Sequence, residues 1–272
     1  MDVPIRFLPT QTLAPETFLV RQIAGEGMGP EALALNTLVI RGAEPVIVDT
    51  GVGLTAPEWL DRTFELVEPE AVRWVYLSHD DTDHTGNLLS VLERCPQAKL
   101  VIDWFAVERL GGEGMEFPLD RLVILNPGES FCAGDRKLTA IIPPVFDSPT
   151  TRGLFDHTTG VYWAADAFAV MLPGGPVDSA DEYDSAQFDT SFVDLQRLIS
   201  PWHQWLDGDK YRAHVGALRA MEPATAVGCH GIALSGAHLD HAFDLIETLP
   251  DLPAVPRVGQ SDLDTMLAAI AA

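Results

Sequence analysis

Short apolar runs alternate with amphipathic stretches along most of the chain, and this alternation predicts an α/β fold. Several runs are apolar at nearly every position, as expected for strands that are buried on both faces. The predicted strands cover residues 35–40, 45–49, 72–77, 99–102, 121–125, 137–142, 161–165 and 225–229. The predicted helices cover residues 55–67, 87–94, 104–110, 188–220 with an interruption near Ser200, 237–249 and 262–271.

Residues 143–160 interrupt this alternation, because they are rich in Pro, Thr, Asp and Gly. We therefore predict a long loop of the kind that carries function between the strands at 137–142 and 161–165. The chain contains no internal repeat, low-complexity tract or linker-like segment. A single domain over residues 1–272, with helices flanking two sheets, is expected.

The charge of the chain excludes two classes of partner. It contains 17 Lys and Arg against 40 Asp and Glu, a formal net charge of −23, which repels nucleic acids and anionic membrane surfaces. The longest mostly apolar run, residues 161–172, contains Asp166 and is shorter than the roughly 20 residues of a membrane span. The N-terminus lacks the features of a secretory signal, so a cytoplasmic location is expected.

The cysteines predict no structural cross-link. Cys95, Cys132 and Cys229 are odd in number, far apart and outside any C-x-x-C motif. We interpret all three as ordinary buried thiols in a reducing compartment.

A polar loop at residues 78–87 separates the predicted strand at 72–77 from the next helix. Five of the six residues from 79 to 84 have side chains that bind metals. Clustered carboxylates repel one another unless a cation neutralises them, which favours a metal site over a solvated acidic loop. In an extended loop, His79, Asp81 and Asp83 at alternate positions converge on one side, whereas His84 points elsewhere.

Three further candidates follow other predicted strands. Asp49 ends the strand at 45–49, Asp166 follows the strand at 161–165, and His230 follows the strand at 225–229. Singly, an Asp or His at a strand end is more often a capping residue. In this order, and together with the polar loop, the three indicate one site assembled from several strand ends.

With these motifs, the chain resembles the metallo-β-lactamase superfamily over essentially all 272 residues. The resemblance implies an αββα sandwich with the metal loops on one edge. It also implies that Asp49, in a D-T-G motif, supports the metal loop without binding metal, that Asp166 bridges two metals, and that His230 is the last histidine ligand.

The details are most similar to the diiron domain of flavodiiron proteins. Asp81 is acidic where that family has Glu and zinc hydrolases have His; residues 36–38 (Asn-Thr-Leu), 166–168 (Asp-Ala-Phe) and 229–231 (Cys-His-Gly) add to the likeness. Oxygen ligands favour iron or manganese over zinc. The resemblance therefore implies two metal ions, iron foremost, with zinc or manganese as alternatives.

The chain departs from that family at one ligand. Phe146 stands where flavodiiron proteins have a histidine. Asp147 is the nearest replacement, as a carboxylate ligand or alternatively as a loop-capping residue, and His157 is a weaker substitute. If nothing replaces the histidine, the first metal position is partly vacant.

A second departure is that no flavodoxin domain and no phosphate loop for FMN follow residue 250, so flavin is not expected in this chain. Standalone domains of this kind bind dioxygen or accept electrons from separate partners, and a homodimer is common among relatives.

Three functions remain open at this point. The first is a diiron protein that binds or reduces O₂ or NO, in which His79, Asp81, Asp166 and Asp147 hold one iron and Asp83, His230 and the shared Asp166 hold the other. The second is a zinc-type hydrolase of an ester, lactone or thioester, in which His84 joins the second position. The third is a non-enzymatic sensor or binding module that keeps the fold with an inactive metal site.

Overall fold

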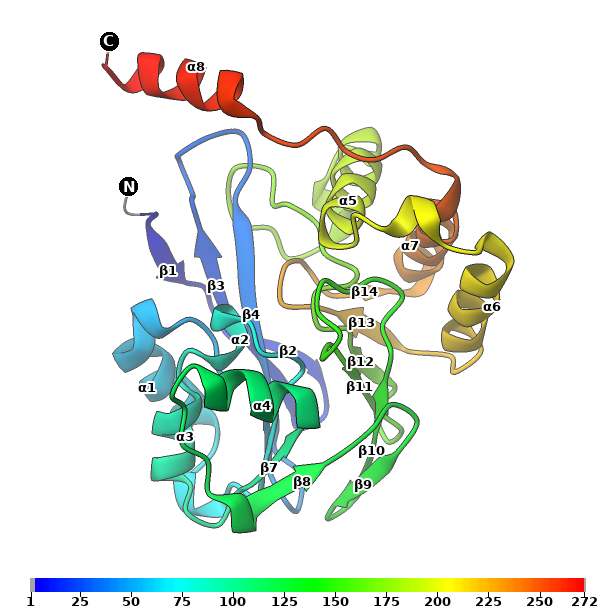
Figure 1. The fold of residues 1–272 in the computed structure, drawn as a ribbon. Helices are drawn as coiled ribbons and strands as arrows, with labels where there is room; N and C mark the ends of the chain where they lie inside the picture. The colour runs from blue at the N-terminus through cyan, green and yellow to red at the C-terminus, as the bar shows by residue number, and fades with distance from the viewer. Residues whose placement is uncertain (1–2, 272) are drawn as a thin grey trace.

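Two β-sheets pack face to face between helices in the computed structural model, which describes residues 3–271 (Figure 1). The strands of the first sheet are β1 (Ile5–Phe7), β2 (Gln11–Ala14), β3 (Thr17–Ala24), β4 (Leu33–Ile40), β5 (Val46–Val48), β6 (Trp74–Tyr76), β7 (Lys99–Ile102) and β8 (Leu122–Ile124). The strands of the second are β9 (Ser130–Ala133), β10 (Arg136–Ile141), β11 (Gly153–Asp156), β12 (Val161–Trp163), β13 (Thr225–Val227) and β14 (Leu234–Ser235). This arrangement confirms the predicted αββα sandwich.

Except for α8 (Gln260–Ala271), which Figure 1 shows at the end of an extended segment away from both sheets, the helices form two groups, one beside each sheet. These helices are α1 (Ala56–Leu66), α2 (Thr82–Thr85), α3 (Leu88–Arg94), α4 (Trp104–Gly112), α5 (Ser185–Ile199), α6 (Gly208–Arg219) and α7 (Gly236–Glu247). The first group packs against one sheet through buried side chains such as Trp59 and Leu88. The second group packs against the other sheet through buried side chains such as Phe192 and Phe243. Between the sheets, side chains such as Trp163 form a third apolar cluster.

The order of the strands brings distant parts of the chain to one edge. The first sheet runs β1-β3-β4-β5-β6-β7-β8, with β2 paired to β3, and the second runs β14-β13-β12-β11-β10-β9. Strands β5, β6, β7 and β8 are parallel, and so are β12 and β13. Parallel neighbours end on the same side, so the loops after β5, β6, β12 and β13 meet there.

The prediction of a loop over residues 143–160 is wrong for the middle of that segment. Residues 153–156 form β11, which is buried and pairs with both β10 and β12. Most of the Pro, Thr, Asp and Gly residues that suggested a loop belong to the segments on either side of this strand. Gly153 permits the pairing, because a Cβ there would lie 2.7 Å from the Trp163 carbonyl oxygen.

A second glycine brings the polar loop against the loop after β5. A Cβ on Gly86 would lie 2.1 Å from the backbone nitrogen of Gly53, so only glycine fits this approach. The Gly86 N–H donates to the Gly51 carbonyl at 2.9 Å, and the Thr50 N–H donates to the His84 carbonyl at 2.7 Å. The two loops that carry candidate ligands are therefore tied together through their backbones.

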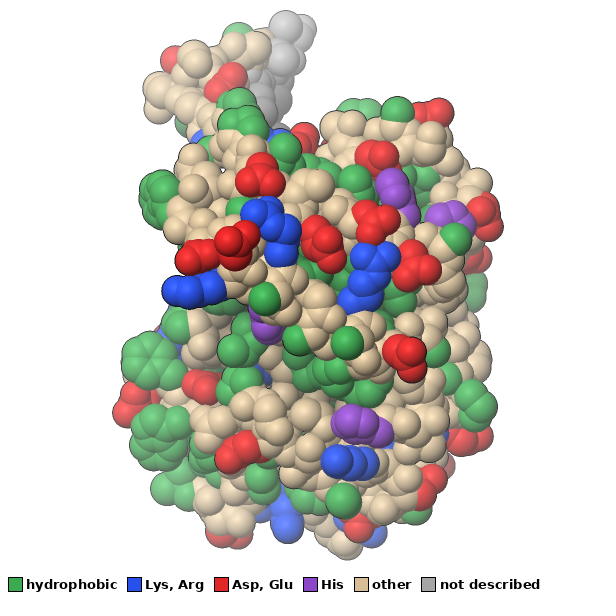
Figure 2. Space-filling model, turned by 90° about the vertical axis from the view of Figure 1, so that its right-hand side faces the viewer, with side chains coloured by type: hydrophobic (Ala, Val, Ile, Leu, Met, Phe, Trp, Pro, Cys, Tyr) green, Lys and Arg blue, Asp and Glu red, His purple; other side chains and the backbone are tan. Residues whose placement is uncertain are grey.

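The surface agrees with the acidic composition. On the face shown in Figure 2, Lys and Arg side chains in the upper half lie among Asp and Glu side chains. Arg219 of α6, for example, lies 2.7 Å from a carboxylate oxygen of Asp244 on α7. Within residues 3–271, no helix combines the length and apolar character needed to cross a bilayer.

The three cysteines are free thiols. Cys95 and Cys229 are buried as expected, but Cys132 is exposed, so its assignment as a buried thiol is wrong. Cys132 lies on β9, the last strand of its sheet, with its side chain on the solvent face.

Candidate metal centre

The candidate ligands come together where the strand ends of the two sheets meet. They are His79 and Asp81 in the loop after β6, Asp83 and His84 on α2, Asp147 between β10 and β11, Asp166 after β12, and His230 after β13. Within the described part of the chain, these residues and Cys229 form three groups whose ligand atoms lie within 4.8 Å of one another. Apart from the weaker candidate His157, every residue proposed from the sequence as a ligand belongs to one of these groups.

The three imidazoles are each held by one ring nitrogen and directed inward by the other. His79 Nδ1 lies 3.1 Å from Ser78 Oγ, His84 Nδ1 lies 2.9 Å from Asp49 Oδ2, and His230 Nδ1 lies 3.0 Å from the Ala34 carbonyl oxygen. Metal-binding histidines characteristically have such a partner on the nitrogen that does not bind metal. In all three rings, Nε2 is the nitrogen that faces the centre.

Asp166 lies at the centre of the site, where its carboxylate faces two different groups of ligands. Its Oδ2 lies 3.2 Å from His79 Nε2. Its Oδ1 lies 3.1 Å from His84 Nε2 and 3.5 Å from His230 Nε2. The side chain is 5% exposed, so these three imidazoles are its main polar surroundings. Each carboxylate oxygen thus lies nearest to different imidazoles, which belong to two sets of ligands, while His79, His84 and Asp166 also form one group that joins the two sides of the site.

The first set comprises His79, Asp81 and Asp147. His79 Nε2 lies 3.9 Å from Asp81 Oδ2, and both carboxylates are more exposed to solvent than the imidazole. The ring of Phe146 packs instead against Trp202, with ring centroids 5.7 Å apart. Asp147 thus lies beside His79 and Asp81, as expected for a residue that replaces the missing histidine.

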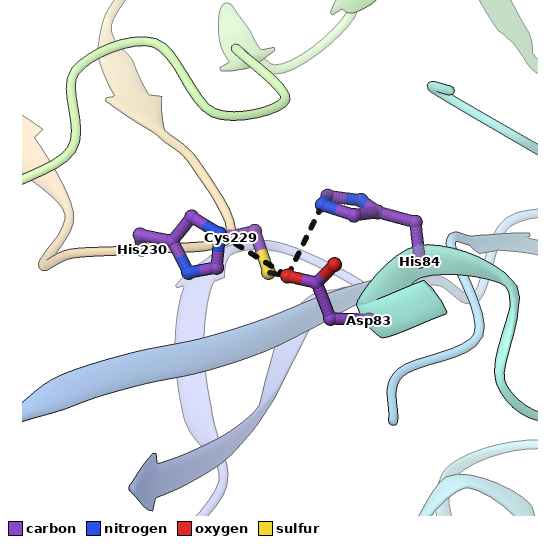
Figure 3. Close-up of side chains that lie close together, drawn as sticks. All are labelled: Asp83, His84, Cys229 and His230. Carbon is purple, nitrogen blue, oxygen red and sulfur yellow. Dashed lines mark hydrogen bonds and ion pairs between the residues drawn. The ribbon is translucent and has the colours of Figure 1, made fainter. Parts of the chain in front are cut away.

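The second set comprises Asp83, His84, Cys229 and His230 (Figure 3). Asp83 Oδ2 lies 3.2 Å from His230 Nε2 and 3.7 Å from His84 Nε2. The expectation that His84 points elsewhere is wrong, because the chain does not stay extended: α2 begins at Thr82 and turns His84 toward the centre.

Cys229 was not expected in the site. Its thiol sulfur lies 4.0 Å from Asp83 Oδ2 (Figure 3). The only signal in the sequence is its position directly before His230, and adjacency alone does not establish that two side chains face the same point.

The charges within the site are strongly coupled. Burial on its own raises the pKa of Asp83, but the hydrogen bond from His230 and the nearby His84 outweigh burial and lower it to about 2. Burial would lower the pKa of His84 and His230, yet the Cys229 and carboxylate groups around them raise both well above the usual value. The acidic groups therefore draw positive charge into the site.

Asp147 shows the opposite tendency. Its pKa is raised by burial and by the neighbouring Asp166 and Asp81 carboxylates, against the weaker attraction of His79. Negative charge is thus not fully neutralised at the first set of ligands. In addition, His79 Nε2 is buried and, although it lies 3.2 Å from Asp166 Oδ2, makes no well-directed hydrogen bond to any described residue. An unpaired imidazole nitrogen beside under-neutralised carboxylates fits a bound cation.

Asp49 supports the site from behind. Its carboxylate is fully buried and accepts hydrogen bonds from the Ser78 backbone N–H and hydroxyl, each at 2.7 Å, and from the Trp163 indole N–H at 3.0 Å. With its contact to His84, it connects β5, the polar loop and β12 without facing the centre. This geometry matches the supporting position that the D-T-G motif implies.

Asn36 of β4 fixes the turn that carries His230. Its side-chain amide donates to the carbonyls of Gly228 and Gly231 at 3.0 and 2.8 Å. These two hydrogen bonds lie on either side of Cys229 and His230, so they restrict the movement of both side chains.

Backbone strain is concentrated around the same centre. Asp49, Ala165 and Phe168 are buried non-glycine residues with φ of 60°, 53° and 60°. Conformations of this kind cost on the order of 1–3 kcal/mol and persist where the surrounding structure imposes them. Two of these residues flank Asp166, so the strained turn sets the direction of the central carboxylate.

His157 does not belong to any of the three ligand groups. Its Nε2 lies 2.7 Å from the Thr139 hydroxyl, and the residue sits in the turn between β11 and β12. Among the described residues, Asp147 is therefore the better substitute for the missing histidine.

Comparison with known proteins agrees with the geometry. Residues 34–231 match the model of a family described as "ODP family beta lactamase". The chain is 23% identical over 188 residues to a diflavin flavoprotein of Nostoc sp. (strain PCC 7120), an alignment covering 69% of this chain and 31% of that protein. The chain thus spans about a third of the length of the first curated relatives that it matches.

Solved structures show the same fold. The rubredoxin oxygen:oxidoreductase of Desulfovibrio gigas superposes with a TM-score of 0.75 at 15% identity, over 90% of this chain and 63% of that one. The flavodiiron protein of Giardia intestinalis superposes with a TM-score of 0.73 at 18% identity, over 90% of this chain and 60% of that one.

Proposed function

Because the chain belongs to the ODP family of beta lactamases, we propose that it is a non-haem diiron protein that binds and reduces dioxygen or nitric oxide. The observation that carries this proposal is the placement of Asp166, whose two carboxylate oxygens face two separate sets of donors. A bridging carboxylate between two metal positions requires this placement.

In this proposal, His79, Asp81 and Asp147 hold one iron, and Asp83, His84 and His230 hold the other. Asp166 is shared between them. When bound, iron supplies the electrons and the open coordination positions that a diatomic substrate needs. Carboxylates are hard donors that suit iron in its oxidised state, which explains the acidic character of the first set.

The residues of the chain contribute positioning and access. Asp49, Ser78 and Ala34 hold the three imidazoles by their outer nitrogens, so each Nε2 keeps its direction when substrate enters. Asp81, with 44% of its side chain exposed, lies on the open side of the site, whereas the side chains of His79 and His84 are fully buried. Small molecules would therefore reach the centre past the first set of ligands.

The electron donor and the assembly are also part of the proposal. The D. gigas relative is named for rubredoxin and oxygen, and the Nostoc relative is named for flavins. By analogy, we propose that this chain takes electrons from a separate donor group or protein and works as a homodimer.

The second candidate is a dinuclear zinc hydrolase acting on an ester, lactone or thioester. The observation that favours it is the position of His84, which gives the second set of ligands two imidazoles where the sequence suggested one. Imidazole-rich sites suit zinc.

Metal analysis separates the two candidates. Protein purified from cells supplied with both iron and zinc is expected to contain two iron ions per chain and to show ferric absorption in the visible range. Anaerobic reduction followed by exposure to O₂ or NO should consume the gas. Colourless protein that contains two zinc ions and hydrolyses thioesters would instead establish the hydrolase.

The loop after β10 provides a sharper prediction about the first metal position. Replacing Asp147 with Ala is expected to reduce the iron content from two ions to one, because His79, Asp81 and the shared Asp166 oxygen are then a weak set of ligands. Replacing Phe146 with His restores an imidazole donor and is expected to raise affinity about tenfold, about 1.4 kcal/mol. Isothermal titration with ferrous iron measures both effects.

The matched control is Asp209→Ala, since the Asp209 side chain is fully exposed on α6. This variant is expected to bind iron like the wild type. Unchanged iron binding in both loop variants would mean that this loop does not contribute a ligand.

A further inference from the structure

One buried donor in the second set, the thiol of Cys229, has no part in the function proposed above. Cys229 is 1% exposed, and its sulfur and the ligand atoms of Asp83, His84 and His230 all lie within 4.8 Å of one another (Figure 3). Resting on the proposed metal centre, we infer that Cys229 binds the second metal ion as a thiolate.

The backbone fixes the direction of this side chain. The Cys229 N–H donates to the Ala165 carbonyl at 2.7 Å, and its carbonyl accepts from the Asn36 N–H at 2.9 Å. The Asn36 amide holds the residues on either side of Cys229 and His230. Two successive residues therefore present a sulfur and an imidazole nitrogen to the same carboxylate oxygen of Asp83.

Cys95 shows what an ordinary buried thiol looks like in this fold. It lies in the apolar cluster beneath α1, α3 and α4, where burial raises its pKa to about 12. Cys229 also touches apolar core residues on one side, but its sulfur faces two imidazoles and a carboxylate on the other. A sulfur so surrounded can join the ligands of a cation, whereas Cys95 has no such neighbours among the described residues.

The thiolate makes the two metal positions chemically different. The first set offers one imidazole and mainly carboxylate oxygens, which suit iron or manganese. The second set offers two imidazoles and a sulfur, which suit softer divalent ions such as zinc, cobalt and ferrous iron. Binding forms a metal–sulfur bond and releases the thiol proton to solvent, with no change of oxidation state.

Cobalt(II) provides the test, because cobalt–thiolate bonds absorb strongly in the near ultraviolet whereas nitrogen- and oxygen-bound cobalt does not. The wild-type apoprotein titrated anaerobically with cobalt(II) is expected to develop this charge-transfer band at the second metal position. Cys229→Ser should lose the band while still binding cobalt, with weaker affinity. Cys132→Ser, which removes an exposed thiol far from the site, is the matched control and should keep the band.

A measurement on the wild type makes the test independent of how the variant folds. X-ray absorption of the zinc-loaded protein should show one sulfur at about 2.3 Å from half of the zinc ions. Cobalt or zinc bound at two ions per chain without a sulfur signal would overturn the role of Cys229 and leave the metal centre intact. No stoichiometric metal binding at all would instead overturn the proposed function.

Discussion

Replacing Asp166 with alanine is expected to remove both metal ions from the protein. Its Oδ2 faces His79, and its Oδ1 faces His84 and His230, so no neighbouring side chain can replace either oxygen. The same change leaves three imidazoles pointing at an empty centre without the carboxylate that attracts a cation. The iron content is therefore expected to fall from about two ions per chain to nearly none.

Metal content and thermal unfolding measure this effect together. A ligand present at 100 times its Kd stabilises the native state by about 2.7 kcal/mol, so iron should raise the melting temperature of the wild type. In Asp166→Ala this rise should disappear, whereas Asp209→Ala, changed at an exposed position, should keep it. An Asp166→Ala protein with the wild-type iron content would contradict the bridging assignment.

The sequence predicted strands β4 to β8, β10, β12 and β13 and the polar loop, because these features are encoded locally. Strands such as β6 and β7 are uninterrupted apolar runs between polar turns, and such runs are apparent without any knowledge of partners. The loop from His79 to His84 is likewise a dense local cluster of metal-binding side chains. The resemblance to a metal-binding fold then assigned Asp49, Asp166 and His230 to the same site.

Features that depend on distant partners were missed. Strand β11 is stabilised by pairing on both sides and by full burial, while its flanks carry the turn residues that indicate a loop. Strands β1, β2, β3, β9 and β14 also lie where the sequence suggested no element. β-Propensity depends on burial and neighbours, so such strands are the hardest to predict from one sequence.

It was harder to predict which way the side chains of the site point than which residues belong to the site. An extended loop sends alternate side chains the same way, and that assumption turned His84 away from the other metal-binding side chains of the loop and kept it as a ligand only for the hydrolase. One helical turn at α2 instead presents Asp83 and His84 to the same centre. Cys229 was missed for a related reason. The direction of its side chain depends on the strained turn after β12 and on the hydrogen bonds from Asn36 to the turn after β13, and neither is apparent in the sequence.

Replacing Asp49 with alanine is expected to have the largest effect on stability. The Asp49 carboxylate accepts bonds from the Ser78 N–H, the Ser78 hydroxyl and the Trp163 indole and also contacts His84, all within the core. Removing one partner from a buried charged network typically costs about 3–5 kcal/mol, because the remaining buried polar groups lose an acceptor that water cannot replace. Chemical denaturation of the metal-free protein should show a loss of that size.

The comparison with Asp49→Asn separates charge from backbone strain. Asp49 has a φ of 60°, a region that asparagine tolerates better than alanine. Asparagine keeps the shape and one acceptor oxygen but brings an NH₂ group against the donors of Ser78 and Trp163. Its loss of stability should therefore lie between those of Asp49→Ala and the exposed control Asp209→Ala, which is expected to change stability by at most about 0.5 kcal/mol. If Asp49→Ala were as stable as that control, the carboxylate would not be what holds the polar loop against β5 and β12.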